Sequence, residues 1–245
     1  MISAHLHLPL LAYMLFLGRA TGLVTPVTKP VCESNGLCFM QNPVQDSLSE
    51  VGFAFPRSRI GVEPEMLVSM KVQLPYGFAG IMPGAGAEKR ALPGSTSLIS
   101  ALWSVFATRE VVDFTDPAFL AAMNSNSFVI QVSDLRPNHT FVPTGASGIT
   151  PAPGAFFVNA SFYRLVTRFQ GAAMRELGIS PDETTTINYI SSMTLPTYIT
   201  NSTDAPPVAL FDASPADVSS WRFELDGKTA QFENYTEMLK AAGLS

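Results

Sequence analysis

The side chains that most often do chemistry in proteins are scarce in this chain. His5, His7 and His139 are its three histidines, and the first two lie in an apolar N-terminal segment. A Ser-His-Asp triad would have to use His139, and no Gly-x-Ser-x-Gly turn is present to expose a nucleophilic serine. His139 lies in a loop-like stretch, where a surface histidine is the simpler interpretation. We therefore predict no catalytic residue and a protein that is not an enzyme.

Metal and phosphate chemistry find little support in the sequence. A zinc or copper site needs two or more imidazoles or thiolates, and Cys32 and Cys38 are the only cysteines. The stretch CESNGLC places a Gly turn between them, which favours an oxidised pair closing a short hairpin, with two free thiols as the alternative. The turn from Gly84 to Gly86 lacks the Gly-Lys-Ser/Thr ending of a phosphate-binding loop. We predict no metal site.

The carboxylates and the aromatic side chains each allow a functional and a structural interpretation. Three aspartates near the last expected strand could form a catalytic pair, but solvated loop positions explain them better: Asp212, Asp217 and Asp226. Four aromatic residues could stack against a sugar or pack in the core, and core packing is favoured: Tyr76, Phe78, Trp103 and Trp221.

Composition restricts the class of protein that carries these residues. Hydrophobic residues make up 47% of the 245 residues and charged residues only 14%, which excludes a disordered chain and predicts a sizeable core. The formal net charge is −5 and basic residues are not clustered. A nucleic-acid partner is therefore not expected.

The N-terminus predicts secretion. Residues 8–18 form an apolar run that is too short to cross a bilayer, and small residues at Ala20 and Gly22 suit cleavage between Ala20 and Leu23. We assign residues 1–22 to a signal peptide and residues 23–245 to one domain, with no membrane contact after cleavage. A membrane anchor is the alternative, and it would need about 20 apolar residues.

Four Asn-x-Ser/Thr sequences agree with an extracellular, glycosylated protein. Each is weak evidence alone, but together on a chain with a signal peptide they predict surface glycosylation. The acceptor positions are Asn138, Asn159, Asn201 and Asn234.

The expected elements are mostly short strands separated by Gly/Pro turns. The stretch YGFAGIMPGAGA, residues 76–87, predicts a buried strand that ends at Pro83 and runs into a Gly turn. A helix is expected over 117–123, and another after a cap at Thr229. Further strands are expected over residues 36–40, 51–56, 66–74, 97–106, 128–132, 155–169, 184–193 and 220–225, with loops over 137–153 and 194–207.

This pattern contains no strand–helix–strand alternation. It predicts an all-β fold, an antiparallel immunoglobulin-like β-sandwich with short helices, one of them at the C-terminus. The Gly turn then becomes the rim of a pocket. We predict this rim to consist of Tyr76, Phe78, Met82, Gly84, Gly86 and Trp221.

Five stretches of the chain resemble the cytochrome domain of fungal cellobiose dehydrogenases, a DOMON-like β-sandwich. The last of the five is the most specific because it matches without a gap over seventeen residues. The stretches are CESNGLCF at 32–39, VGFAFP at 51–56, FAGIMPGAGA at 78–87, FYRLVTRFQG at 162–171 and FELDGKTAQFENYTEML at 223–239.

The resemblance implies a site for haem b held between a methionine and a histidine. The family's methionine falls on Ala87 in this chain and its histidine on Asp217. Neither residue can ligate haem as the family does, since alanine has no donor and aspartate is a poor axial ligand. Met82 and His139 are weak substitutes. The family's second cysteine pair is also missing, with Phe169 and Ala172 in its place.

The resemblance therefore predicts a secreted, glycosylated relative that has lost haem and acts as an extracellular binding or interaction module. Its partner would be an extracellular ligand or a component of the cell wall, and no cofactor is expected. The alternative is a b-type cytochrome domain that transfers electrons between a flavin dehydrogenase and a lytic polysaccharide monooxygenase.

Overall fold

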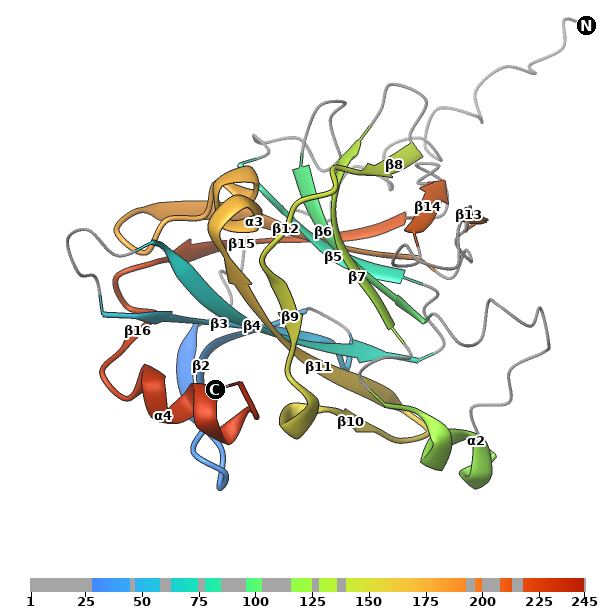
Figure 1. Cartoon of the computed structure of the whole chain (residues 1–245), viewed down its shortest axis with the longest axis horizontal. Helices are drawn as coiled ribbons and strands as arrows, with labels where there is room; N and C mark the ends of the chain where they lie inside the picture. The colour runs from blue at the N-terminus through green and yellow to red at the C-terminus, as the bar shows by residue number, and fades with distance from the viewer. Residues whose placement is uncertain are drawn as a thin grey trace, which may run out of the picture.

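A computed structural model gives the fold. It describes residues 28–44, 47–57, 63–74, 78–84, 96–102, 116–124, 128–135, 140–192, 197–199, 208–212 and 218–244. The predicted signal peptide lies outside these ranges. The described part consists of two β-sheets with short helices at the ends and on one face (Figure 1), so the predicted all-β sandwich is confirmed.

The first sheet has eight strands and contains the first four strands of the chain together with four later ones. Its order is β1-β2-β3-β4-β11-β10, with β16 on β3 and β9 on β11. All pairs are antiparallel except the parallel pair of β16 and β3. The strands are β1 (Lys29–Cys32), β2 (Cys38–Pro43), β3 (Glu50–Pro56), β4 (Glu65–Gln73), β9 (Ile149–Pro151), β10 (Phe157–Val158), β11 (Phe162–Gln170) and β16 (Gln231–Phe232).

The second sheet also has eight strands, all paired antiparallel, in the order β13-β14-β8-β7-β6-β5-β12-β15. The strands are β5 (Phe78–Pro83), β6 (Thr96–Leu102), β7 (Phe128–Leu135), β8 (Thr140–Pro143), β12 (Thr184–Ser192), β13 (Thr197–Ile199), β14 (Val208–Asp212) and β15 (Val218–Asp226).

The second sheet has to curl. Six strand spacings of about 4.8 Å separate β14 from β15, roughly 29 Å if the sheet were flat. The six residue steps from Asp212 to Val218 can span only about 20–22 Å. Curling brings β14 toward the start of β15, where Figure 1 shows the two strands.

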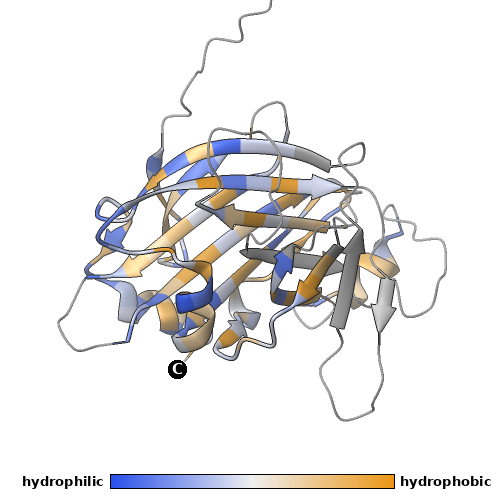
Figure 2. Cartoon of the chain, turned by 90° about the horizontal axis from the view of Figure 1, so that it is seen from above, coloured by the Kyte–Doolittle hydropathy of each residue, from blue (hydrophilic) through white to orange (hydrophobic). Residues whose placement is uncertain are grey.

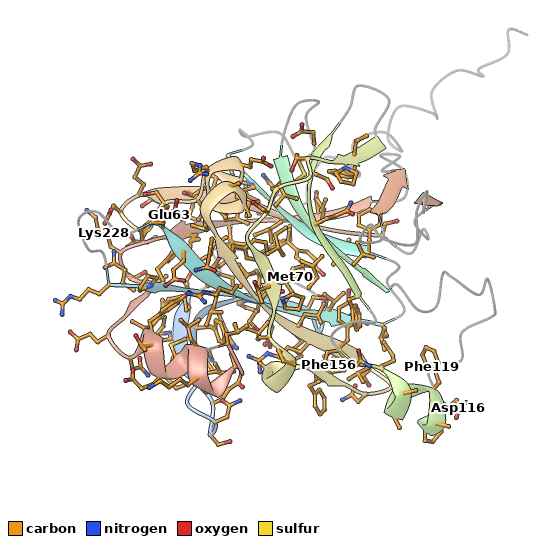
Figure 3. The ribbon with its side chains drawn as sticks, in the orientation of Figure 1. Glu63, Met70, Asp116, Phe119, Phe156 and Lys228 are labelled. Carbon is orange, nitrogen blue, oxygen red and sulfur yellow. A yellow bond between two sulfur atoms is a disulfide. The ribbon has the colours of Figure 1, made fainter. Side chains whose placement is uncertain are left out.

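The main core lies between the two sheets. Alternate residues of each strand point inward, as the alternating bands of hydropathy along the strands show (Figure 2). Phe53 of the first sheet meets Phe223 of the second with ring centroids 6.2 Å apart, and Phe128 meets Tyr163 at 4.6 Å. Met70 lies at the centre of the molecule, whereas Asp116 and Phe119 lie at its edge (Figure 3).

Three short helices complete the described part of the fold. In α2 (Pro117–Ala122) the Asp116 carboxylate accepts from the backbone N–H of Ala118 at 2.8 Å, which confirms the predicted helix start. Helix α3 (Gly171–Leu177) buries three apolar side chains and contacts strands of both sheets, so it closes one end of the sandwich. The third is α4 (Tyr235–Ala241), and a 3-10 turn, η2, spans Pro153–Ala155.

Helix α4 covers part of the outer face of the first sheet. Its Tyr235 and Met238 pack on outward residues of β3, β4 and β11, namely Ala54, Leu67 and Val166. The hairpin of β1 and β2 joins this second core through Leu37, Cys38 and Phe39. A disulfide joins Cys32 to Cys38, which confirms the predicted pair.

Several predicted elements differ from the structure. The strand expected over 155–169 is two strands, because Asn159 accepts backbone N–H bonds from Ser161 and Phe162 and turns the chain. The expected loops over 137–153 and 194–207 contain β8, β9 and β13. Thr229 does not cap the last helix, since its hydroxyl bonds to the Asp226 carbonyl in a turn and Asn234 precedes the helix.

Candidate functional site

Phe78 and Met82 lie on the face of the second sheet that is turned away from the first sheet, here called the far face. Ile81, between them in alternation, is level with Tyr189 and Trp221 on the sandwich side. Met82 is fully buried and Phe78 almost so, and the Phe78 and Phe141 rings are 6.4 Å apart. This part of the far face is therefore buried, whereas Arg222 and Glu224 at its β15 edge are exposed.

The far face also carries buried polar groups. Met82 is paired across the ladder with Asn188, which is 7% exposed and whose Nδ2 has no hydrogen-bond partner. Further along, Gln131 donates to the Ser133 hydroxyl at 2.9 Å. An unpaired buried amide beside a buried thioether makes this face a candidate site for a ligand.

The strand register shows how far apart the described residues nearest to the two predicted ligand positions, Ala87 and Asp217, lie along the strands. β5 ends at Pro83, level with Ile187 and Phe223, whereas Val218 is level with Ser192 and Phe78. Gly84 and Val218, the nearest described residues, are therefore at opposite ends of three adjacent strands. Gly84 is level with Thr186 and Glu224, six residue steps from Val218 on β15, and at about 3.3 Å per step the two are roughly 20 Å apart along the strands.

The predicted ligand positions themselves lie outside the described residues. This holds for Ala87, Asp217 and the substitute His139, and it holds for Tyr76 and Gly86 of the predicted rim. The pairing of Ala87 with Asp217 therefore stays a prediction.

Gly84 and Trp221 are the remaining rim residues. Gly84 has a φ of +73° and its N–H donates to the Thr186 carbonyl at 2.9 Å, so it turns the chain off the end of β5. Trp221 is half-buried on the sandwich side of β15, and its indole N–H has no partner.

The described residues provide only part of a haem site. Met82 supplies a thioether, but none of the three histidines falls within the described ranges. Within those ranges there is also no group of three or more His, Cys, Asp or Glu that could hold a metal ion. The fit of a methionine–histidine pair therefore depends on His139, which lies outside the described residues.

Among the described residues, two pockets open on the first sheet. The smaller, about 320 Å³, lies on its outer face, and we call it the sheet-face pocket. Phe157 is half exposed and meets the Phe162 ring at 5.6 Å, and the Lys71 ammonium lies 4.7 Å from the Phe162 ring centre. The pocket is lined by Glu33, Gln41, Glu50, Gly52, Ser69, Lys71, Phe157, Phe162 and Arg164.

Ion pairs hold the charged groups of the sheet-face pocket. Arg164 forms an ion pair with Glu33 and donates through Nε to the Ser69 hydroxyl at 2.9 Å. Lys71 pairs with Glu50 at 3.3 Å. These charges are compensated within the pocket, so it favours a neutral ligand over an ionic one.

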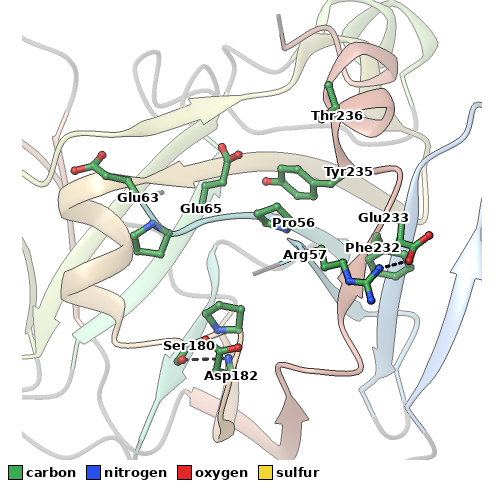
Figure 4. Close-up of a pocket in the computed structure, with 12 residues that line it drawn as sticks. Pro56, Arg57, Glu63, Glu65, Ser180, Asp182, Phe232, Glu233, Tyr235 and Thr236 are labelled. Atoms are coloured by element: carbon green, nitrogen blue, oxygen red, sulfur yellow. Dashed lines mark hydrogen bonds and ion pairs between the residues drawn. The ribbon is translucent and has the colours of Figure 1, made fainter. Parts of the chain in front are cut away.

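The larger pocket, about 450 Å³, lies beside the start of α4, and we call it the helix pocket (Figure 4). It brings together segments far apart in the sequence: the end of β3, the start of β4, the loop before β12, and the turn between β16 and α4. Its lining residues are Pro56, Arg57, Glu63, Pro64, Glu65, Ser180, Pro181, Asp182, Phe232, Glu233, Tyr235 and Thr236.

Tyr235 is the buried polar group of the helix pocket. It is only 4% exposed and its hydroxyl has no hydrogen-bond partner. Burial, and secondly the nearby Glu65 carboxylate, raise the pKa of the Tyr235 phenol well above its usual range. The hydroxyl is therefore protonated at any physiological pH and can donate a hydrogen bond.

Glu65 is fixed by three donor groups. Its Oε2 accepts from Arg168 Nε at 2.7 Å and from Gln170 Nε2 at 3.0 Å, and Arg168 Nη2 donates to the same oxygen. Arg57 pairs with Glu233, and Arg175 lies 3.6 Å from Glu63.

Sequence reasoning did not find either pocket. The helix pocket includes the sequence Glu233-Asn-Tyr-Thr, which indicated a glycosylation site and formed part of the resemblance at 223–239 but did not indicate a pocket. The proline-flanked stretches at Pro56, Pro64 and Pro181 become neighbours only through the parallel ladder of β16 on β3 and the turn before β12.

The described part of the chain contains no helix long and apolar enough to pass through a bilayer. Of the four predicted glycosylation sites, Asn159 and Asn234 are described, and Asn234 is exposed. Asn138 and Asn201 lie outside the described residues.

Comparison with known proteins identifies the fold. No family model and no curated protein sequence matches the chain. The cytochrome b domain of pyranose dehydrogenase from Coprinopsis cinerea matches with a TM-score of 0.58 at 16% identity, over 88% of this chain and 95% of that domain. The cytochrome domain of Myriococcum thermophilum cellobiose dehydrogenase matches with a TM-score of 0.57 at 13% identity, over 90% and 98%. The chain therefore has the fold of these dehydrogenase cytochrome domains, as the resemblance in its sequence predicted.

Proposed function

We propose that the chain is a secreted, glycosylated binding module that keeps the cytochrome-domain fold without haem. The proposal rests on the resemblance in the sequence, which puts Ala87 and Asp217 at the family's two ligand positions, in a chain that has the fold of dehydrogenase cytochrome domains. The partner is an extracellular ligand or a cell-wall component, and no residue is assigned a catalytic role.

Three features support the proposed extracellular location of the protein. They are the signal-like segment 1–22, the Cys32–Cys38 disulfide and the four glycosylation sequences. The two pockets of the first sheet supply surfaces on which a binding module could act.

The absorption spectrum tests the haem-free state. We expect the secreted protein to be colourless, and haemin added in equal amount to give no b-type Soret band and no dithionite-dependent α band. A tightly bound b-type spectrum in the purified protein would end this proposal.

A b-type cytochrome is the second candidate, and the far face favours it. Met82 is fully buried there beside the unpaired amide of Asn188, so a thioether, which can ligate haem iron, lies in an apolar environment. On this alternative the native protein shows a Soret band that both Met82→Ala and His139→Ala weaken, and a flavin dehydrogenase reduces it anaerobically. A spectrum unchanged in both variants would reject that ligand pair.

A further inference from the structure

We propose that the helix pocket binds a neutral sugar. The inference rests on the proposed role as a binding module and names the chemistry of its ligand. It does not depend on the state of the far face, because the helix pocket lies on the opposite sheet.

The first argument is the Tyr235 hydroxyl. It is buried and protonated, and it has no partner, which is rare because an unpaired buried hydroxyl is unfavourable. Figure 4 shows it pointing along the pocket toward Glu65. A sugar hydroxyl between them could accept from Tyr235 and donate to the Glu65 carboxylate at the same time.

The second argument is charge. Three of the four lining carboxylates already face a guanidinium: Glu65 with Arg168, Glu63 with Arg175, and Glu233 with Arg57. A cationic ligand would gain little from carboxylates that are already compensated. A neutral ligand rich in hydroxyls can use the same oxygens as acceptors and the Arg57 N–H groups as donors.

The third argument is shape. A volume of about 450 Å³ is within the range of roughly 300–1,000 Å³ that small-molecule sites occupy. The lining combines polar groups with the apolar surfaces of Pro56, Pro181 and Phe232. A sugar ring has the same division, with hydroxyls around its edge and C–H groups on its faces.

The sugar could come from two sources. One is a free or cell-wall saccharide. The other is a glycan of the protein itself, because Asn234 is an exposed glycosylation position directly between Glu233 and Tyr235. Both sources offer the same chemistry, and protein made with and without glycans separates them.

The experiment starts with unglycosylated protein from a bacterial periplasm, which keeps the disulfide. Saturation-transfer NMR and calorimetry are run with glucose, mannose, galactose, xylose and cellobiose, and with spermidine as a cationic probe. We expect at least one neutral sugar to bind with millimolar affinity or better. We expect Tyr235→Phe to weaken that binding at least tenfold, and Asp182→Asn, at an exposed lining position, to weaken it severalfold.

Tyr189→Phe is the matched control, because it deletes a hydroxyl from a buried tyrosine on the other sheet. It should leave sugar binding unchanged. The proposal is overturned if no neutral sugar binds at 10 mM, if Tyr235→Phe and Asp182→Asn bind as the native chain does, or if spermidine binds more tightly than every sugar.

A second preparation from a glycosylating yeast identifies the source. Free-sugar binding that is lost there and restored by Asn234→Gln assigns the pocket to the protein's own glycan, whereas unchanged binding assigns it to an external saccharide. Absorption spectra of the same samples keep the two proposals apart. A haem spectrum would reject the haem-free state and leave the sugar result standing.

Discussion

At the scale of single residues, glycines fix the chain where β9 meets the end of β11 and at the turn after β5. Gly148 has a φ of +91°, and a Cβ there would lie 2.2 Å from the Gln170 carbonyl oxygen. Gly84 has a φ of +73° but open space around it. An alanine at Gly84 would therefore introduce backbone strain alone, whereas an alanine at Gly148 would introduce both backbone strain and a steric clash.

We expect Gly148→Ala to reduce the free energy of unfolding by about 3 kcal/mol or more, because it adds a clash with backbone to an unfavourable φ. Gly84→Ala should cost only about 1 kcal/mol. Urea unfolding of both variants measures the difference. Equal losses would show that the Gln170 backbone moves away freely.

Tyr235 also predicts a pH dependence. Its pKa in the folded state is raised above the ordinary value of 10.0, so above about pH 10 the unfolded chain loses the phenolic proton while the folded chain keeps it. The stability contributed by Tyr235 is then complete below pH 10 and falls at higher pH. The slope is about 1.4 kcal/mol per pH unit.

The comparison with Tyr235→Phe isolates this effect from the other tyrosines. Urea unfolding at pH 9, 10 and 11 should show the native chain losing stability faster than the variant above pH 10. Parallel curves would mean that the phenol is not shielded in the folded state.

Residue identity alone did not reveal Tyr235 or Glu65 as neighbours. Cys32 and Cys38 were predictable because their partners lie within one short loop. Tyr235 and Glu65 are far apart in the chain, and only the ladder of β16 on β3 brings them to one pocket.

At the scale of elements, the β1–β2 hairpin and α4 stabilise each other through the second core. The disulfide closes the hairpin beside Cys38, which is buried under α4. Replacing both cysteines with alanine should lower the free energy of unfolding by about 2–2.5 kcal/mol, from the entropy of the short loop. Chemical denaturation under oxidising conditions measures it, and an unchanged midpoint would show that the loop is ordered without the bond.

Helix α4 should contribute through Met238, which is fully buried. Met238→Ala is expected to cost about 2–5 kcal/mol, because it leaves a cavity between the helix and the outer face of the first sheet. Glu237→Ala, at an exposed position of the same helix, should stay within about 0.5 kcal/mol. Similar losses in the two variants would argue against the packing of α4 on the sheet.

Helices and strands could be predicted from the sequence where a local signal, such as a helix cap, determined the structure. Asp116 and Pro117 marked α2 because a cap and a first-turn proline act locally. The strand expected over 155–169 failed because its alternation continued through Asn159, whose side chain turns the backbone between β10 and β11. Very short strands such as β9 and β16 have no periodicity of their own and exist only by pairing with a neighbour.

At the scale of the whole molecule, the fold was predictable and the site was not. The motifs that carried the resemblance lie mainly on strands of the two sheets, and their order fixed the sandwich. The pockets depend on which strand ends and turns meet, which the alternation of residues does not encode. The far face illustrates this. Met82 lies in the stretch 78–87, which carries part of the resemblance, but only the register of β5 on β12 shows that Asn188 is its neighbour.

The ladder of β16 on β3 joins segments that leave the ribosome at very different times. Arg57 and Glu233, which flank it, are 176 residues apart, so at about 5–20 residues per second their synthesis is separated by roughly 9 to 35 s. Until the last helix emerges, the apolar outer residues Ala54 and Leu67 have no α4 to cover them. Protease treatment of stalled nascent chains that stop before residue 231 should cut this region, and protection there would contradict the expectation. We therefore expect the growing chain to depend on chaperones until α4 has emerged.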